Sequence, residues 1–367
     1  MSSEQASAAP LHLLFVGNPA SIHVRRWAGF FAAHGHRVDV AGLWTALPDD
    51  ADAPFPVHRL GRPATAAVAL RRLARRVRPD VVHAHYLTHY GWLAWAAAIR
   101  PYVVTLWGSD VLLDTRRSPL RRAWARRTLA GAACVTADSP DVIAAAVRMG
   151  ARADRIHEIQ FGVDTTRFQP GPASPDLQRT LDVVGRRVVF APRAIAPLYR
   201  TLVAVEALSA LPDDVVLVAT MAGAEPAYLA RVRATIDRLG IASRVRLIPA
   251  IAHQEMDAHM RLADVVLSIP ASDGTPVTML EALSTGRPIV ATDLPGVRPW
   301  LSQLRPDLMV PVDNAAATGA AIARALAMSE GERRTMAIAA RQLAVMRGDQ
   351  TRNMLRMEQL YAGLVKP

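Results

Sequence analysis

Short apolar runs alternate with longer amphipathic segments along the whole chain. Strands are predicted in the first half at Leu11–Val16, Arg37–Ala41, Asp80–Ala84, Tyr102–Leu106, Ala133–Ala137 and Ile156–Ile159. After a break the pattern begins again, with strands predicted at Val188–Ala191, Val215–Ala219, Val245–Ile248, Asp264–Ser268, Pro288–Ala291 and Met309–Val312. Helices fit between the runs, for example at His23–His34, Pro140–Met149, Leu202–Leu211, Ala227–Leu239, Val277–Ser284 and Ala315–Ala327. Such alternation predicts an α/β protein with two Rossmann-like domains, each a parallel sheet covered on both faces.

The break between the two halves is rich in proline and polar residues, which is typical of a linker. We therefore expect an N-terminal domain over residues 1–168, a linker over 169–187 and a C-terminal domain over 188–347. Residues 348–367 predict a C-terminal helix that packs back toward the N-terminal domain. Open α/β sheets bind ligands at the carboxyl ends of their strands. The expected binding site is therefore a cleft between the two domains.

Composition places the chain among ordinary globular proteins. Its 367 residues are 51% hydrophobic and 20% charged, and its one cysteine, Cys134, excludes a disulfide within the chain. Residues 1–10 lack the apolar stretch of a signal peptide, and the apolar segment 92–99 is too short to span a bilayer. These features predict a cytoplasmic protein, and peripheral contact with the inner face of a membrane stays open.

The net charge of +11 is unevenly placed, because the first 180 residues carry 22 arginines against 14 acidic residues. Two arginine clusters, at 69–78 and 116–127, suit either an anionic membrane surface or the solvated faces of amphipathic helices. No helix-turn-helix, zinc or aromatic-platform signature accompanies the charge, so nucleic acid is not an expected partner. The only lysine is Lys366, so a phosphate site must use arginine, histidine or backbone amides.

The most informative segment is Ser272–Ala282, in which two carboxylates, Asp273 and Glu281, stand eight positions apart. Between them a loop turns into a predicted helix, with Thr275 as the expected N-cap and Pro276 as the expected first helical residue.

Free amides at such a helix start favour an anion, and here they belong to Val277 and Thr278. The segment thus offers donors for phosphates and acceptors for sugar hydroxyls. A capped helix with a solvated Glu281 is the alternative.

Two further candidates follow predicted strands. His85 ends a strand of the first half, with His83 on the same face, and Arg193 follows the first strand of the second half. Arg193 is a candidate for a diphosphate, and Arg200 is a second one. A His-x-His pair could bind a metal, but no cysteine or acidic partner lies at ligand spacing, so no metal is expected. The alternatives are a packed histidine and surface arginines.

Two weaker candidates lie in loops of the first half. Gly17, after the first predicted strand, allows the backbone to approach a ligand. Asp110, in the sequence Trp-Gly-Ser-Asp, either orients an acceptor hydroxyl or caps the next helix.

Taken together, these residues resemble family 4 of the retaining glycosyltransferases, which have the GT-B fold. The resemblance rests on the acidic-x7-Glu element with Ala282–Asp293 after it, and on Gly35–Val38, Asp80–His85, Trp107–Asp110 and Gly162–Asp164. It implies metal-independent transfer of a hexosyl group, with retention, from a nucleoside diphosphate sugar. The acceptor would be a glycan, a lipid-linked sugar or a small molecule, and no cofactor is implied.

The resemblance also implies roles for single residues. Glu281 would bind the nucleotide ribose, Asp273 would lie beside the donor sugar, and Arg193 would bind the diphosphate. His85 would lie close to the reacting centre. Further donor contacts are implied at Gly17, Arg200, Gly274, Thr275, Val277 and Thr278.

The chain departs from the family pattern at three places. Asp273 stands where glutamate is usual, no lysine follows Arg193, and Met221 replaces a usual glycine. These departures suggest one alternative, a non-catalytic protein that binds a nucleotide sugar and regulates or scaffolds a partner. A sugar-nucleotide epimerase of related architecture is another alternative.

Overall fold

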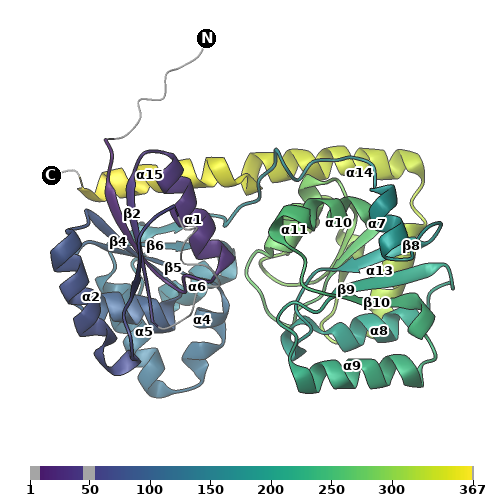
Figure 1. The fold of residues 1–367 in the computed structure, drawn as a ribbon, viewed down its shortest axis with the longest axis horizontal. Coiled ribbons are helices and arrows are strands. Elements are labelled where there is room, and N and C mark those ends of the chain that lie inside the picture. Colours follow the sequence, from purple (N-terminus) through teal and green to yellow (C-terminus); the bar gives the residue numbers. More distant parts are fainter. Residues whose placement is uncertain (1–8, 44–53, 366–367) are drawn as a thin grey trace, which may run out of the picture. The chain divides into compact units, whose positions relative to one another are not determined.

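The chain divides into two compact units, which are described separately. The computed structural model describes residues 9–43 and 54–365. The N-terminal unit comprises residues 1–161 together with 351–367, and the C-terminal unit comprises residues 162–350. The chain therefore passes between the units twice (Figure 1).

The described part of the N-terminal unit contains a seven-stranded parallel sheet in the order β3-β2-β1-β4-β5-β6-β7. Its strands are β1 (His12–Val16), β2 (Arg37–Gly42), β3 (Val57–Arg59), β4 (Val81–His85), β5 (Tyr102–Thr105), β6 (Cys134–Ala137) and β7 (Ile156–Glu158). Six of them coincide, within about one residue at either end, with the predicted runs. The sequence did not reveal β3, because this edge strand has three residues and none of them is fully buried.

The helices of this unit flank the sheet (Figure 1). They are α1 (Ile22–Ala33), α2 (Pro63–Val77), α3 (Trp92–Ala96), α4 (Ser109–Leu112), α5 (Pro119–Gly131), α6 (Pro140–Arg148) and α15 (Gln350–Val365). Helix α15 contributes the fully buried Tyr361, whose hydroxyl hydrogen-bonds to Nδ1 of His83. Glu358 on the same helix lies 3.0 Å from Nε2 of His36. These contacts attach the C-terminal helix to the sheet of the N-terminal unit.

The C-terminal unit, all of whose residues are described, contains a six-stranded parallel sheet in the order β10-β9-β8-β11-β12-β13. Its strands are β8 (Arg187–Ala191), β9 (Val215–Thr220), β10 (Val245–Ile248), β11 (Val265–Ser268), β12 (Ile289–Thr292) and β13 (Met309–Val310). Its helices are α7 (Pro175–Thr180), α8 (Thr201–Ser209), α9 (Pro226–Arg238), α10 (Met256–Leu262), α11 (Val277–Ser284), α12 (Arg298–Leu301), α13 (Ala315–Leu326) and α14 (Glu330–Leu343).

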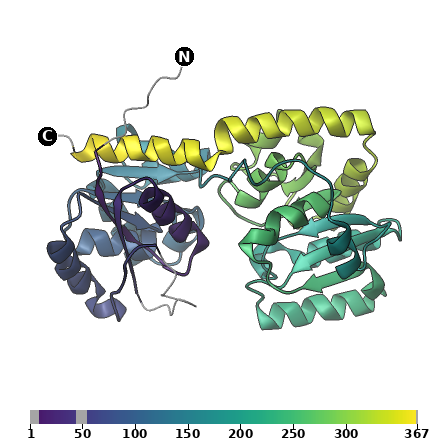
Figure 2. The same cartoon turned by 45° about the horizontal axis from the view of Figure 1, so that its top comes forward.

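Both faces of this second sheet are buried, as its continuous apolar strands predict. Successive residues of β8 point to opposite faces, so Val188 and Phe190 join one apolar cluster while Val189 joins the other. The first cluster is completed by α10, α11, α12 and α14, and the second by α8, α9 and α13. In Figure 2, α14 lies on one side of this sheet and α9 on the other.

The segment predicted as a linker is folded against the C-terminal unit. Residues 169–187 contain α7, whose start is capped by the Ser174 hydroxyl accepting the amide of Leu177 at 3.4 Å. Phe168, just before this segment, is fully buried. The prolines that suggested a linker include Pro175 at the first turn of α7, where proline is well tolerated.

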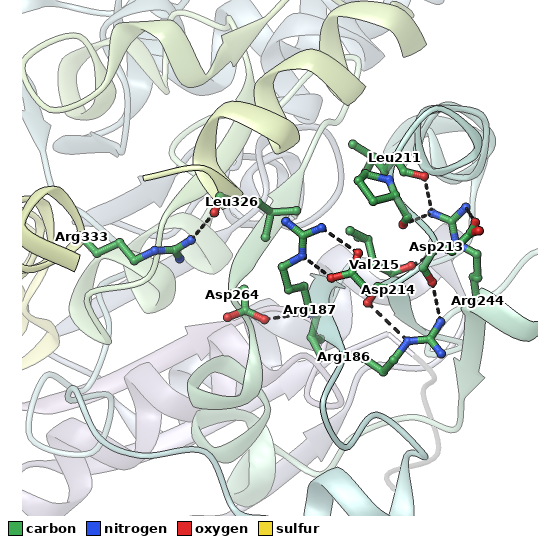
Figure 3. A network of polar contacts seen from close by, with 12 residues as sticks. Arg186, Arg187, Leu211, Asp213, Asp214, Val215, Arg244, Asp264, Leu326 and Arg333 are labelled. Atoms are coloured by element: carbon green, nitrogen blue, oxygen red, sulfur yellow. Dashed lines mark hydrogen bonds and ion pairs between the residues drawn. The ribbon is translucent and has the colours of Figure 1, made fainter. Parts of the chain in front are cut away.

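Several arginines of the C-terminal unit serve the fold (Figure 3). The buried guanidinium of Arg244 donates to the carbonyl oxygens of Leu208, Leu211, Pro212 and Val215. Arg187 forms a two-pronged pair with Asp214, at 2.6 and 2.7 Å. Arginine supplies nearly all the strong cations of this chain, so it serves both structural and binding roles. An arginine can therefore be assigned to a ligand site only from its surroundings in the structure.

Candidate functional site

The acidic segment predicted from the sequence lies at the start of α11. Pro276, with φ −65° and ψ 122°, precedes the helix, and its carbonyl accepts the amides of Met279 at 2.9 Å and Leu280 at 3.3 Å. Pro276 is therefore the N-cap, and the prediction of Thr275 was wrong because the extended ψ of the proline delays the helix by one residue. The amides of Val277 and Thr278 precede the first helical bond and have no acceptor within the helix.

Both carboxylates of the segment are held in place. Glu281 is buried, with 7% of its surface exposed, on the same helix as Thr278. Asp273 lies in the preceding loop, where its Oδ1 accepts the amide of Gly274 at 3.0 Å. One carboxylate thus lies on each side of the free amides along the chain, as the spacing predicts.

Arg193 joins this segment from a strand 80 positions away. It follows β8, and its Nη2 donates to Oδ2 of Asp273 at 2.8 Å. The guanidinium carbon lies 4.4 Å from the centre of the Tyr199 ring. Burial lowers the pKa of Arg193, but Asp273 and Tyr199 outweigh it, so the pKa is raised above its usual value. About a fifth of each side chain of the ion pair remains exposed, 21% for Arg193 and 20% for Asp273.

The loop before α11 is backed by a glycine that the sequence analysis missed. A Cβ atom added to Gly296 would lie 2.1 Å from the carbonyl oxygen of Gly274 and 3.1 Å from the amide nitrogen of Thr275. Only a residue without a side chain allows the two backbones to approach this closely. The one available signal was the Pro-Gly pair after the strand β12, which by itself predicts only a turn.

Arg200 is directed to other partners. It precedes α8 with φ +57°, its Nε lies 2.5 Å from Oδ1 of Asp313, and it also donates to the carbonyl of Pro197. The structure therefore brings together Arg193, Asp273 and the start of α11, and pairs Arg200 with Asp313.

In the N-terminal unit, His85 lies at the carboxyl end of β4 beside Gly17. Only 1% of His85 is exposed, and within the described residues neither ring nitrogen has a hydrogen-bond partner. A Cβ at Gly17 would lie 3.4 Å from that of His85. Burial, together with the charge of His23, lowers the pKa of His85 to about 3. The imidazole is therefore neutral, and its two buried ring nitrogens carry the cost of unmade hydrogen bonds.

His85 contributes to a pocket of about 480 Å³ within the N-terminal unit, which we call the aromatic pocket. It is lined by Asn18, Ser21, Leu43, His85, Tyr86, His89, Tyr90 and Trp107. The Tyr86 hydroxyl donates to Oδ2 of Asp114 at 2.8 Å, which fixes one wall. Tyr86, His89 and Tyr90 carried no recognisable motif, and only the fold brings them together with Trp107.

The predicted acceptor contact of Asp110 is corrected by the structure. Asp110 is fully buried, and its carboxylate accepts the amides of Leu87 at 2.7 Å, Trp107 at 3.0 Å and Val111 at 3.0 Å. Burial raises its pKa to about 6, although these amides oppose the shift. A carboxylate enclosed in this way holds the segments that carry Leu87 and Trp107, and it has no surface left for an acceptor.

His83 is packed rather than poised to bind a metal. Its Nε2 lies 2.6 Å from the hydroxyl of Thr105, and its Nδ1 is bonded to Tyr361. Among residues 9–43 and 54–365, no group of three or more histidine, cysteine or acidic side chains has a geometry that could hold a metal ion. No helix in these ranges is long and apolar enough to cross a membrane.

The buried His85 predicts acid sensitivity. Its native pKa of about 3 lies below the ordinary 6.5, so the unfolded chain takes up the proton first as the pH falls. The stability that His85 contributes above pH 6.5 is therefore lost progressively toward pH 3. We expect His85→Gln to show a smaller drop in Tm than the parent protein between about pH 7 and pH 4.5. Thermal denaturation at both pH values measures this, with the exposed His34→Gln as control; equal drops in all three proteins would contradict it.

Two Rossmann-like units with parallel sheets define a protein of the GT-B fold. Residues 12–139 match the family model described as Glycosyl transferase 4-like, and residues 185–328 match the one described as Glycosyl transferases group 1. The chain belongs to these glycosyltransferase families, with one matched region in each unit.

Individual proteins agree with this placement. The D-inositol 3-phosphate glycosyltransferase of Jonesia denitrificans is 28% identical over 258 residues, covering 63% of this chain and 60% of that protein. The protein of the same name from Xylanimonas cellulosilytica is 30% identical over 239 residues, covering 60% and 57%. The chain thus spans about 60% of the length of the first of these relatives. The crystal structure of Anabaena Alr3699/HepE in complex with UDP and glucose matches with a TM-score of 0.83 at 19% identity, covering 96% of this chain and 100% of that one.

Proposed function

We propose that this protein is a retaining glycosyltransferase that moves a hexosyl group from a nucleoside diphosphate sugar to an acceptor hydroxyl in glycan or glycolipid assembly. The observation that carries the proposal is the junction before α11. There a partly buried arginine pairs with Asp273, and the same segment carries the two amides without an acceptor in the helix and the buried Glu281, within a region that matches a glycosyltransferase family model. UDP and glucose bound to a protein of the same fold support a donor of this class.

The proposed donor site matches the charges that develop in the reaction. As the bond between the anomeric carbon and the diphosphate breaks, negative charge grows on the leaving phosphate. Arg193 and the amides of Val277 and Thr278 stabilise that charge without a metal ion, because they are already in place. The Glu281 carboxylate accepts from ribose hydroxyls and Asp273 from hydroxyls of the sugar.

The acceptor is proposed to bind in the aromatic pocket, with its reacting hydroxyl near His85. The acceptor oxygen forms the new bond to the anomeric carbon on the face that the diphosphate leaves, and its proton passes to a phosphate oxygen. The proposed role of the neutral His85 is a hydrogen bond to the acceptor. D-inositol 3-phosphate, named in the relatives, is one acceptor to test, beside lipid-linked sugars and small glycosides.

We further propose that the protein works in the cytoplasm and that the basic face of α2 allows peripheral contact with an anionic membrane. Arginines 71, 72, 75 and 76 are exposed along this helix. Attraction of such a face to anionic lipid weakens with salt.

A non-catalytic nucleotide-sugar-binding protein is the second candidate. It is favoured by Asp273, which is one methylene shorter than the usual glutamate, and by the missing lysine, since Arg200 is engaged with Asp313. Incubation with a radiolabelled donor separates the two candidates, because a pure binder releases no nucleotide. A thermal-shift screen of UDP-, GDP- and ADP-sugars identifies the donor beforehand, since a ligand that binds the native state raises Tm.

Removing the charge of either carboxylate in the segment Ser272–Ala282 is expected to weaken donor binding. Asp273→Asn and Glu281→Gln keep the side-chain shape but replace a charge-assisted hydrogen bond, which corresponds to a loss of roughly 10- to 100-fold in affinity. Calorimetric titration with the donor found in the screen measures the effect. Asp214→Asn, in an exposed ion pair of the same unit, is the control and should stay within about twofold. Parent-like affinity in both junction variants would show that the segment does not bind the donor.

A further inference from the structure

A second pocket of the N-terminal unit is surrounded by arginines. It has a volume of about 280 Å³ and is formed by α4, the turn after it, α5 and α6. We call it the arginine pocket, and its lining residues are Val111, Leu112, Thr115, Arg116, Arg122, Arg126, Ala145, Arg148 and Met149. Three separate elements thus bring four guanidinium groups to one small concavity.

None of these four arginines makes an ion pair or hydrogen bond through its side chain within the part of the chain that the structure describes. The neighbouring Arg117, by contrast, pairs with Asp114 at 3.1 Å. All four arginines are exposed, and no acidic residue is among those that line the pocket, so together they give it a positive potential. The pocket therefore favours binding of an anion of high charge density, and the geometry of guanidinium groups matches the oxygens of a phosphate in particular.

The floor of the pocket is apolar, since Val111 and Ala145 are buried and Leu112 and Met149 are partly buried. The hydroxyl of Thr115, also on the floor, is engaged with the carbonyl of Val111 at 2.6 Å. An apolar floor displaces water from one side of a bound anion and so strengthens its attraction to the surrounding charges.

The arginine pocket shares a chain segment with the aromatic pocket. Within residues 107–116, Trp107 lines the aromatic pocket, and Thr115 and Arg116 line the arginine pocket. Asp114 lies between Trp107 and Thr115 in the sequence, and it accepts a hydrogen bond from the hydroxyl of Tyr86 in the wall of the aromatic pocket. An anion bound by Arg116 would therefore act on the segment that shapes the proposed acceptor site.

We propose that the arginine pocket binds a phosphate group of a second ligand, at a site separate from the donor site. The phosphate belongs either to a free phosphorylated compound or to a phospholipid headgroup, and both present the same oxygen atoms to the four arginines. The proposal does not depend on catalysis, because the site is recognised by its charge alone.

The test compares two double variants on the same helix, Arg122→Gln with Arg126→Gln, and Arg121→Gln with Arg127→Gln. Each removes two charges from α5, but only the first pair lines the pocket. Both are made in an Arg193→Ala background, so that the proposed donor arginine does not contribute. Titration calorimetry measures binding of inorganic pyrophosphate, and co-sedimentation measures binding to phosphatidylcholine vesicles with and without phosphatidylglycerol. Thermal denaturation confirms that both variants are folded.

We expect the pocket pair to weaken pyrophosphate binding by about tenfold or more, and the control pair to change it by less than about twofold. Loss of phosphatidylglycerol binding in the pocket pair alone, without pyrophosphate binding, would identify a lipid headgroup as the source of the phosphate. An equal loss of binding in the two double variants would overturn the proposal, since it would indicate attraction to the general charge of the surface rather than to the pocket. Absence of binding to both probes in the Arg193→Ala parent would overturn it as well.

Discussion

Arg193→Ala is expected to lower kcat by roughly 10²–10³-fold at saturating donor, because a preorganised donor to the developing negative charge is removed. Arg193 lies at the carboxyl end of β8, is only one-fifth exposed, and pairs with Asp273. Its charge is therefore screened by less water than that of an exposed arginine. Steady-state rates of nucleotide release, measured over a range of donor concentrations, separate this effect on kcat from one on KM.

The matched control is Arg187→Ala, at the opposite end of the same strand. Arg187 pairs with the exposed Asp214, so its removal costs little stability and leaves kcat within about twofold. Turnover of Arg193→Ala close to that of this control would remove Arg193 from the proposed chemistry.

The ion pair with Asp273 adds a second way to examine Arg193. If the two side chains act as a unit, the fall in kcat of the double variant Arg193→Ala with Asp273→Asn will be smaller than the product of the falls in the two single variants. Strict additivity would mean that the 2.8 Å contact does not couple them in the reaction.

Gly296→Ala is expected to lower kcat/KM by about 10²-fold, although Gly296 itself contacts no ligand in the proposed mechanism. A Cβ at this position would lie 2.1 Å from the carbonyl oxygen of Gly274, so the backbone of the loop must move. A displacement of about 1 Å is enough to cost this much when it misplaces binding groups. Overpacking should also lower the stability by about 1–3 kcal/mol.

Steady-state rates, which give kcat/KM, test this prediction together with donor titrations and thermal denaturation. Gly331→Ala is the control, because a Cβ there meets no atom within 4 Å and the residue lies in α14, where alanine is well suited. A Gly296→Ala protein that binds donor as tightly as the control would show that the loop adapts freely.

Local sequence patterns were sufficient to predict the strands and to identify the segment at the start of α11. Apolar runs marked twelve of the thirteen strands to within a few residues, since burial on both faces of a parallel sheet leaves a continuous apolar signature. They could not reveal β3, with three residues at a sheet edge. The helix start was displaced by one residue because the conformation of Pro276, rather than its identity, determines where the helical bonds begin.

Local patterns could not predict hydrogen-bond and ion-pair partners that are distant in the sequence. Asp110 looked equally suited to a ligand or to a cap, and only the surrounding fold supplied the three amides that enclose it. Arg193 was the first candidate for the diphosphate and Arg200 the second, and only the structure shows that Arg193 pairs with Asp273 whereas Arg200 pairs with Asp313.

The sequence by itself thus determined the two-sheet α/β architecture and the chemical groups before α11, since both depend on residues close together along the chain. The tertiary structure alone decided which arginine pairs with Asp273, that Gly296 backs the loop, and that four arginines surround one pocket. These features depend on distances between separate elements, and such distances are fixed only when the elements pack.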